Sequence, residues 1–200
     1  MSDVAALVLA AGKASRFRAA AGEGGPATKL VALLDGKPLV RHVAEAALAS
    51  RARPVVVVTG HARAEVEAAL AGLPVRFVHN PDFATGLASS LRTGVAALPA
   101  AAGGAVVLLG DMPRVSAAVI DALLDAREAS PGASAVAPAT GGRRGNPVLV
   151  TRALFPAIME LSGDVGARAL LAAAGDGVVE TPVDDESIAF DVDTPDALAR

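Results

Sequence analysis

Short hydrophobic runs alternate along the chain with longer segments in which apolar residues recur every three or four positions. The runs VVVV at 55–58 and AVVLL at 105–109 are continuous, which is typical of strands buried on both faces of a sheet. The pattern predicts strands at 4–10, 55–59, 75–79, 105–109, 134–138, 147–150, 178–183 and 188–192. It predicts helices at 38–50, 62–71, 87–98, 116–129, 152–161, 165–174 and 195–199.

Strands that alternate with helices indicate crossover connections and a mainly parallel sheet covered on both faces. We therefore expect an α/β fold, a Rossmann-like three-layer α/β/α arrangement around a mostly parallel, mixed sheet. The 200 residues fit one domain, 1–200, with a sizeable core. The pattern becomes less regular after about Gly132, where shorter strands and the polar stretch GGRRGNP indicate an α+β elaboration.

The composition narrows the class of protein. Hydrophobic residues make up 52% of the chain, without Trp or Tyr, so Val, Leu, Ile and Ala must build the core. The net charge of −3 argues against a general nucleic-acid-binding protein. The lack of cysteine excludes disulfides, thiolate catalysis and cysteine-ligated metals. The start of the sequence is not of the secretory type, and no apolar stretch reaches about 18 residues. We expect a cytoplasmic protein that does not bind a membrane.

Chemically active residues follow the predicted strands. In open α/β sheets, ligands bind outside the carboxyl ends of the strands. There the sequence places a glycine-rich cationic stretch between Gly12 and Lys29, the dipeptide Gly110-Asp111, and the acids Asp191 and Asp193. Cations, backbone donors and carboxylates at one rim predict a site for a polyphosphate with a divalent metal.

The first of these stretches is LVLAAGKASRFRAAAGEGGPATKL, residues 7–30. Consecutive N–H groups at a glycine-rich turn can bind an anion, and Arg16 and Lys29 can add charge-assisted bonds to phosphate oxygens. The stretch contains neither a Walker A motif nor the dinucleotide fingerprint G-x-G-x-x-G. A surface loop with solvated cations is the alternative.

Three aspartates are candidate metal ligands. Mg²⁺ prefers one or two carboxylates together with substrate phosphates, which suits Asp111 directly after a buried strand. Asp191 and Asp193, two apart in an extended segment, point to the same side and could complete an acidic triad around one or two Mg²⁺ ions. As alternatives, Asp111 caps the turn before the 116–129 helix, and Asp193 caps the helix that begins at Pro195.

Two further segments carry candidate binding residues. Ser89 and Ser90, in GLASSLRTG, begin a helix and can hold a ribose, base or phosphate, or serve only as capping residues. Arg143 and Arg144, in GGRRGNP, form a cationic turn that could hold an anionic second substrate, or a solvated loop. No metal is assigned to the histidines, which show no ligand spacing: His42, His61 and His79.

At these residues the chain resembles the MobA-like nucleotidyltransferase superfamily, and particularly the molybdenum cofactor cytidylyltransferases. The resemblance runs in order from residue 4 to near the C-terminus. Its segments are LAAG at 9–12 with Arg16 and KL at 29–30, GKPL at 36–39, GLASSLR at 86–92, GDMP at 110–113, RGNPV at 144–148, GDVGAR at 163–168 and DVDTP at 191–195. The LAAG and GDMP segments are superfamily-wide, whereas RGNPV and GDVGAR point to the molybdopterin-nucleotide branches.

The resemblance implies a fold of the nucleotide-diphospho-sugar transferase type and the transfer of CMP from CTP to molybdopterin with release of pyrophosphate. It implies a nucleotide-binding part at about 1–130 and an acceptor side at about 131–200. By the same resemblance, the expected catalytic residues are Arg16, Lys29 and Asp111. Nucleotide binding falls on Leu9, Ala10, Ala11, Gly12, Arg16, Lys29, Ser90 and Gly110. Acceptor binding falls on Arg144, Asn146 and Arg168, and Mg²⁺ (Mn²⁺ is possible) on Asp111, Asp191 and Asp193.

The sequence departs from the family pattern G-x-S-x-R, followed by an apolar residue and Gly. Ala14 stands at the Ser position with Ser15 shifted by one, and Arg18 stands at the final Gly. The alternatives are guanylyl or other nucleotidyl transfer to molybdopterin, a phospho-acid or a sugar phosphate, and a non-catalytic nucleotide- or cofactor-binding module. A client molybdoenzyme or its chaperone is a further possible partner.

Overall fold

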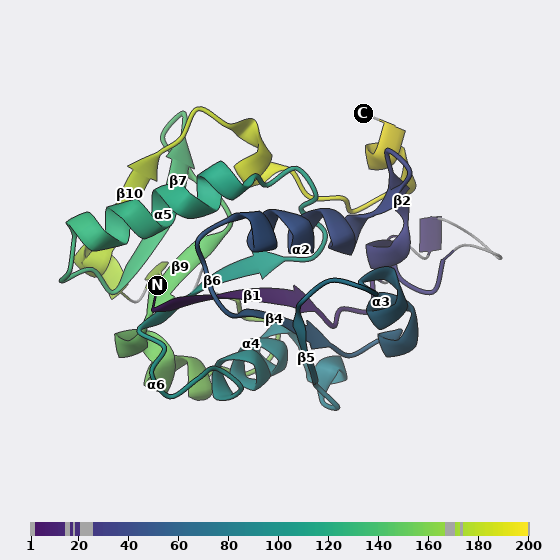
Figure 1. Ribbon diagram of the computed structural model, residues 1–200, viewed down its shortest axis with the longest axis horizontal. Coiled ribbons are helices and arrows are strands. Elements are labelled where there is room, and N and C mark those ends of the chain that lie inside the picture. The colour runs from purple at the N-terminus through teal and green to yellow at the C-terminus, as the bar shows by residue number, and fades with distance from the viewer. Residues whose placement is uncertain are drawn as a thin grey trace.

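A computed structural model describes residues 3–14, 17, 19–20, 26–166, 171–172 and 174–199. Its main sheet follows a single path of neighbouring strands (Figure 1). The path runs through β10 (Val178–Pro182), β7 (Ala135–Thr140), β9 (Val148–Thr151), β6 (Gly104–Leu109), β1 (Val4–Ala10), β4 (Val55–Thr59) and β5 (Arg76–His79). The two-residue strand β8 (Arg143–Arg144) pairs with β7 off this path.

The sheet is mixed but mostly parallel. β1 lies between β4 and β6 and runs parallel to both, and β4 runs parallel to β5. β9 is antiparallel to both of its neighbours, β6 and β7. β7 and β10 are parallel to each other. This arrangement confirms the expected mixed α/β sheet, and it brings the carboxyl ends of β1, β4, β5 and β6 to one edge.

Alternate residues of the strands pack against helices on opposite faces. The even-numbered residues of β1, such as Val8, contact the cluster formed by α2 (Leu39–Ala49), α3 (Arg63–Ala69) and α5 (Ala117–Ala129). Leu7 and Leu9 contact the opposite cluster, which includes α4 (Leu87–Ala96) and α6 (Phe155–Met159). Figure 1 shows α2 and α5 on one side of the sheet and α4 and α6 on the other. The apolar runs are thus buried on both faces, as their composition predicted.

A third apolar cluster lies beyond the sheet edge. Leu34 and Leu39, from the short hairpin β2 (Leu33–Leu34) and β3 (Lys37–Pro38) and the start of α2, pack with Val192 and Phe17. Phe190 and Leu198 are partly buried against the same cluster. The C-terminal segment therefore crosses back to the N-terminal half of the chain, as the yellow trace in Figure 1 shows.

The strand predicted at 188–192 is wrong. Residues Glu186–Ala189 form a 3₁₀ helix, which begins after Asp185 accepts a hydrogen bond from the backbone N of Ser187 at 2.8 Å. Of the alternating apolar residues in this segment, Phe190 and Val192 pack in the third cluster and Ile188 is buried outside it. The helix predicted at 195–199 is a 3₁₀ helix, Pro195–Ala199, and the one at 165–174 lies partly outside the described residues.

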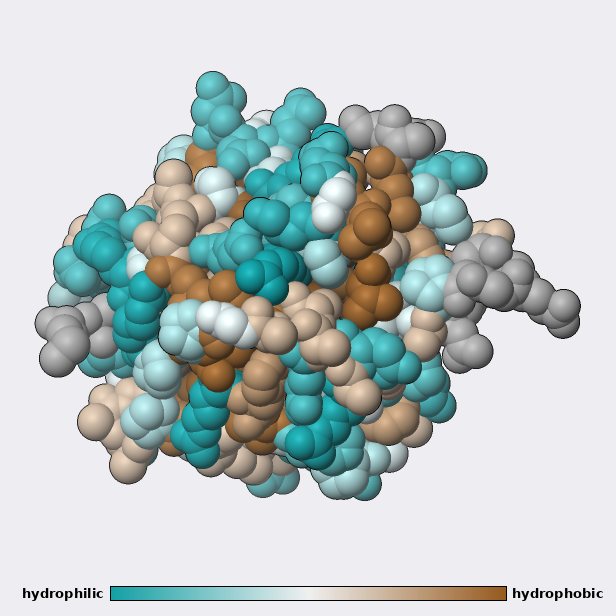
Figure 2. Space-filling model, turned by 45° about the vertical axis from the view of Figure 1, so that its right-hand side comes forward, coloured by the Kyte–Doolittle hydropathy of each residue, from teal (hydrophilic) through white to brown (hydrophobic). Residues whose placement is uncertain are grey.

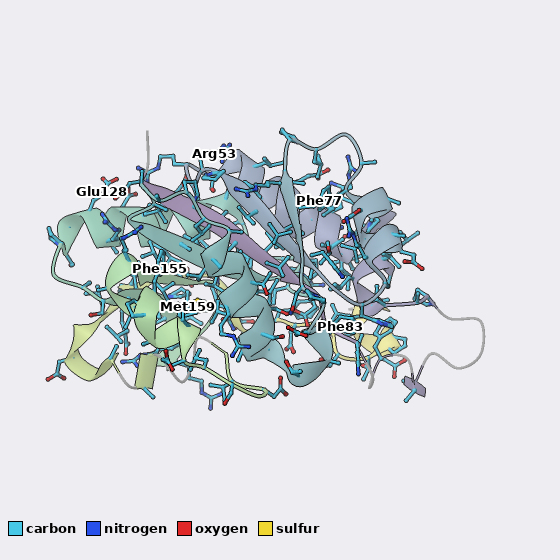
Figure 3. The ribbon with its side chains drawn as sticks, turned by 90° about the horizontal axis from the view of Figure 1, so that it is seen from below. Arg53, Phe77, Phe83, Glu128, Phe155 and Met159 are labelled. Atoms are coloured by element: carbon cyan, nitrogen blue, oxygen red, sulfur yellow. The ribbon has the colours of Figure 1, made fainter. Side chains whose placement is uncertain are left out.

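Side-chain positions match this layering. Phe83 and Phe155 both pack against the cluster on the α4 and α6 face of the sheet. Seen from below, Phe155 and Met159 lie toward one end of that face and Phe83 toward the other (Figure 3). The face in Figure 2 mixes hydrophilic and hydrophobic residues. Within the described residues, no helix combines the length and the hydropathy needed to cross a membrane.

A cation–carboxylate network on α2 gives a pH-dependent contribution to stability. The hydrogen bond from Lys37, joined by one from Arg41 at 3.0 Å, holds the pKa of Glu45 below its ordinary value. The contribution is present above that ordinary value and is lost as pH falls through the lowered pKa. We expect Glu45→Gln to reduce the free energy of unfolding by about 0.5 kcal/mol at neutral pH, a surface-pair magnitude.

Denaturant titrations at a series of pH values test this expectation. The difference between Glu45→Gln and the wild type should shrink as the solution is acidified. Glu65→Gln on α3 is the matched control, because Glu65 makes no ion pair with another described residue. A difference for Glu45→Gln that stays constant with pH would contradict the assignment.

Candidate active site

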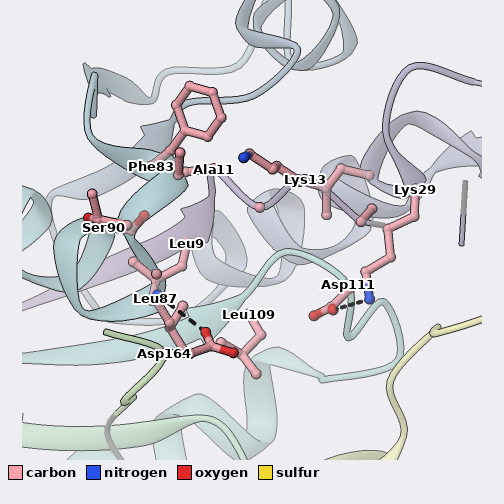
Figure 4. A pocket seen from close by; sticks show the side chains of 16 residues that line it. Leu9, Ala11, Lys13, Lys29, Phe83, Leu87, Ser90, Leu109, Asp111 and Asp164 are labelled. Carbon is pink, nitrogen blue, oxygen red and sulfur yellow. Dashed lines mark hydrogen bonds and ion pairs between the residues drawn. The ribbon is translucent and has the colours of Figure 1, made fainter. Parts of the chain in front are cut away.

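A cavity of about 580 Å³ opens at the carboxyl ends of β1 and β6 (Figure 4). Its walls come from the end of β1 and the following loop, from the 3₁₀ helix Lys29–Val31, from residues 83–90, and from the end of β6. The predicted site residues that line it are Leu9, Ala11, Gly12, Lys29, Ser90 and Asp111. Residues far apart in the sequence therefore meet at the predicted rim.

Lys29 is the centre of the charged end of this cavity. The buried Thr28 precedes the 3₁₀ helix, and its hydroxyl accepts a hydrogen bond from the N–H of Leu30. This turn directs the Lys29 ammonium to two carboxylates, with Nζ 2.7 Å from Oδ2 of Asp111 and 2.9 Å from Oδ1 of Asp193. Burial alone would lower the pKa of Lys29, but Asp111 and then Asp193 outweigh it and raise that pKa. Lys29 is thus held as a cation.

The C-terminal segment brings in the acids. The backbone N of Val192 donates to the carbonyl of Asp111 at 3.0 Å, which fixes residues 191–193 beside the end of β6. Burial, reinforced by the charges of Asp193 and Asp111, raises the pKa of Asp191. In the part of the chain that the structure describes, no three His, Cys, Asp or Glu side chains stand close enough to hold a metal by themselves. The carboxylates of Asp111, Asp191 and Asp193 nevertheless outnumber the Lys29 ammonium at this end of the cavity.

Phe83 forms an aromatic wall on the opposite side of the cavity. The Lys13 ammonium lies 5.9 Å from its ring centroid, and the His61 ring centroid lies at the same 5.9 Å distance. Gly60 is required beneath it, since a Cβ there would lie 2.7 Å from the Cβ atoms of both Ala11 and Phe83. Figure 4 shows Phe83, Ala11 and Lys13 together at this end.

Asn80 is a functional candidate that is marked in the sequence only by its position after a predicted strand. It is 1% exposed, and its side-chain N–H₂ donates to Oγ of Ser89 at 2.9 Å and to Oγ of Ser90 at 3.0 Å. The side-chain Oδ1 of Asn80 accepts a hydrogen bond from the backbone N–H of Asp82 at 3.0 Å. Because Ser90 lines the cavity and accepts from Asn80, its own hydroxyl proton is available to a ligand.

Asp164 is a second residue that sequence reasoning did not assign, although it lies within the quoted segment GDVGAR. Its carboxylate lines the cavity and accepts from the N–H of Leu87 at 3.4 Å, at the start of α4 (Figure 4). The carbonyl of the preceding Gly163 accepts from the N–H of Ala88 at 3.2 Å. The loop at 163–164 therefore closes one side of the cavity.

Gly86 permits this closure, because a Cβ at Gly86 would lie 2.3 Å from the carbonyl oxygen of Gly163 and because its φ is +116°. We expect Gly86→Ala to reduce the free energy of unfolding by at least about 2 kcal/mol, since backbone strain and a steric clash both act. Gly72→Ala is the matched control: φ there is +81°, but a Cβ would meet nothing within 4 Å. Denaturant unfolding should show the larger loss for Gly86→Ala; equal losses would contradict the role of the Gly163 contact.

The remaining predicted residues are placed as follows. Ala10 faces the α2 side of the sheet, and Gly110 is buried with its N–H donating to the carbonyl of Leu9 at 3.0 Å, so neither lines the cavity. Arg144 forms an ion pair with Glu180 at 2.7 Å and lies away from this cavity. The backbone N of Asn146 donates to the carbonyl of Ile188. Arg16 and Arg168 lie outside the described residues.

Comparison with known proteins relates this geometry to a family. The family described as MobA-like NTP transferase domain matches residues 6–178. The chain belongs to this family. A nucleotidyl transferase from Methanothermobacter superposes with a TM-score of 0.84 at 27% identity, covering 98% of this chain and 94% of that one. The MobA-like membership confirms the predicted superfamily, and the nucleotidyltransferase structures confirm the fold type and the enzyme class.

Named relatives of the MobA-like chain differ in their activities. Nicotine blue oxidoreductase of Paenarthrobacter nicotinovorans is 33% identical over 203 residues, covering 98% of this chain and 95% of that protein. Bifunctional protein GlmU of Acidovorax ebreus is 39% identical over 136 residues, covering 63% of this chain, which spans only 26% of GlmU. Rv0371C of Mycobacterium tuberculosis, solved with manganese, has a TM-score of 0.77 at 25% identity, covering 98% of this chain and 96% of that one.

Proposed function

We propose that this MobA-like protein transfers CMP from CTP to molybdopterin and releases pyrophosphate. The observation that carries the proposal is the Lys29 ammonium held between Asp111 and Asp193 at the mouth of the cavity. A fixed cation beside carboxylates suits a reaction in which negative charge develops on phosphate oxygens. The division into a nucleotide-binding part at about 1–130 and an acceptor side at about 131–200 belongs to this proposal.

The nucleotide occupies the 580 Å³ cavity in this proposal. Its triphosphate lies toward Lys29, with Arg16 as the second cation, and Gly12 leaves room for the backbone to approach it. The base and ribose lie toward Ser90, whose free hydroxyl proton suits an oxygen or ring-nitrogen acceptor. The Asp164 carboxylate repels phosphate, so it favours the uncharged, hydroxyl-bearing end of the nucleotide on its side.

The chemistry needs no covalent intermediate. An oxygen of the terminal phosphate of molybdopterin attacks the α-phosphorus of CTP in line, the bond to the bridging α–β oxygen breaks, and pyrophosphate leaves. The attacking phosphate is already ionised at neutral pH, so no general base is required. Lys29 and Arg16 stabilise the negative charge that accumulates on the leaving pyrophosphate.

A divalent cation fits the donor set. Asp111 and Asp193 converge on the Lys29 ammonium, and their charges add to the effect of burial in raising the pKa of the neighbouring Asp191. Mg²⁺ needs only one or two carboxylates when substrate phosphates supply further oxygens. Asp111, Asp191 and Asp193 would hold the cation, which when bound neutralises charge on the phosphate oxygens. The manganese in the M. tuberculosis relative supports a divalent metal here.

The choice of molybdopterin rests on the segments RGNPV and GDVGAR. The choice of CTP rests on the Leu-Ala-Ala-Gly form of the otherwise superfamily-wide first segment, which resembles the cytidylyl type. The test measures pyrophosphate release with each of the four NTPs combined with molybdopterin, a phospho-acid or a sugar phosphate. We expect the highest turnover for CTP with molybdopterin. Higher turnover with GTP, or with a sugar phosphate, would redirect the proposal to that pair.

The same assay separates the remaining alternatives. Binding of CTP without pyrophosphate release under every combination would indicate a non-catalytic binding module. The relative named nicotine blue oxidoreductase suggests a second test, in which the protein is assayed for oxidoreductase activity. Oxidation or reduction of nicotine blue, in the absence of any nucleotidyl transfer, would contradict the proposal.

A further inference from the structure

A second cavity, of about 390 Å³, lies beside the active site and has no part in the nucleotide pocket. Its walls are the end of β7, the strand β8 and the segment at 186–190, together with Arg114. β6 and β7 are both antiparallel to β9, the strand between them, so they run in the same direction. The carboxyl end of β7 therefore lies on the same rim of the sheet as the carboxyl end of β6. The two cavities therefore open along one edge of the sheet.

Positive charge is concentrated in this second cavity. Arg114, Arg143 and Arg144 line it, against a single carboxylate, that of Glu186. The chain as a whole carries a net charge of −3, so this accumulation opposes the overall balance. The Glu180 carboxylate already neutralises Arg144 at 2.7 Å. Neither Arg114 nor Arg143 forms an ion pair with any residue that the structure describes.

Arg114 is held in place without a hydrogen bond from its guanidinium to any residue that the structure describes. Its guanidinium carbon lies 4.2 Å from the centroid of the Phe190 ring. Stacking on an aromatic face fixes a guanidinium while its in-plane donors stay free for a bidentate anion such as a carboxylate or phosphate. Arg114 is thus arranged to receive an oxyanion at the cavity edge.

Ser187 adds a polar group that the protein itself leaves unused. Its Oγ is buried and has no hydrogen-bond partner among the described residues, although Ser187 lines the cavity. A buried hydroxyl without a partner is unfavourable unless a ligand or water completes its bonding. An oxygen-rich group in the cavity would satisfy it.

The wall between the two cavities is thin. Arg114 follows Asp111 by three residues, a span of at most about 11 Å. On the other side of the wall, Phe190 precedes Asp191 directly, and the N–H of Val192 donates to the carbonyl of Asp111. One small molecule can therefore reach from the Lys29 carboxylate network to Arg114.

We propose that the second cavity binds an anionic group on the part of the acceptor that does not react, with Arg114 and Arg143 as its ligands and Ser187 as an additional donor. This inference rests on the proposed nucleotidyl transfer, because it assigns the acceptor's orientation: attacking phosphate at the Lys29 end, second anionic group at Arg114. It adds Arg114, Arg143 and Ser187 to the acceptor side.

The test compares Arg114→Gln/Arg143→Gln with the wild type by pyrophosphate release, with acceptor and nucleotide varied separately. We expect the KM for molybdopterin to rise about tenfold or more, while the KM for CTP and the kcat at saturating acceptor stay within about twofold, since two charge-assisted bonds are lost. Arg63→Gln/Arg76→Gln removes the same charge elsewhere and should leave both KM values unchanged. An unchanged acceptor KM, or equal losses in both KM values, would overturn the inference.

A binding experiment decides the inference independently of turnover. Inorganic phosphate is titrated into the wild type at constant ionic strength, and the Nε–H signals of the arginines are followed by NMR. We expect the signals of Arg114 and Arg143 to shift and that of Arg63 to stay. If these signals do not shift, the inference fails even where the enzyme is active; if they shift without any pyrophosphate release, the proposed function fails and the anion site stands.

Discussion

Replacement of Lys29 by Ala is expected to lower kcat for pyrophosphate release by about 10²–10³-fold, the cost typical of removing a preorganised group that stabilises developing charge. Lys29 is the cation on which Asp111 and Asp193 converge, and its raised pKa keeps it protonated at neutral pH. Without it, the leaving pyrophosphate loses its fixed countercharge. Steady-state kinetics with saturating substrates measure the effect.

Two controls make the Lys29 result specific. Lys37→Ala removes a lysine that pairs with Glu45 outside the cavity, and its kcat should match the wild type. Circular dichroism should show Lys29→Ala to be folded, because Lys29 belongs to none of the three apolar clusters that pack the described helices and strands together. If Lys29→Ala keeps most of its activity while folded, the assignment of Lys29 is wrong.

Asp111→Asn is expected to lower Mg²⁺-dependent turnover by about 10²–10³-fold. The substitution keeps the size of the side chain but removes the charge that faces Lys29 and that would help to hold a divalent cation. Turnover is measured over a titration of Mg²⁺, and we expect the half-saturating concentration to rise as the maximal rate falls.

Asp125→Asn is the matched control for this change, because Asp125 lies on the exposed surface of α5, where it forms an ion pair with Arg51. It should follow the wild-type Mg²⁺ curve. An Asp111→Asn variant with wild-type metal dependence would count against the three aspartates as the metal-binding set and would leave Asp111 only its ion pair with Lys29.

The sequence predicts the sheet well where strands are buried on both faces. VVVV at 55–58 and AVVLL at 105–109 are short, continuous and rich in Val, which favours strands covered on both faces, and they form β4 and β6. The segment at 188–192 misleads because its apolar residues alternate as in a strand, yet Phe190 and Val192 pack on a hairpin that local periodicity does not reveal. That hairpin carried a usable signal, Asp35-Gly36 with φ of +52° and +76°, which is typical of a tight β-turn.

The charged end of the site was predictable for a different reason. Lys29 and Asp111 follow strands of a parallel sheet, so topology alone brings them together. Asn80 and Asp164 could not be assigned in the same way, because their roles depend on contacts to Ser90 and Leu87 that no spacing encodes. For the metal-binding triad and for Arg16 and Arg168, the assignments stay predictions.

The path of the C-terminal segment has a consequence for the order in which the protein becomes active. Lys29 and Asp193, which share a hydrogen bond, stand 164 positions apart. During synthesis the ribosome releases β1, the cavity walls and Lys29 long before residues 190–198 can reach Leu34 and Leu39. A nascent chain can therefore form much of the cavity proposed for the nucleotide while it still lacks Asp191 and Asp193, and it gains both acids when the third apolar cluster closes.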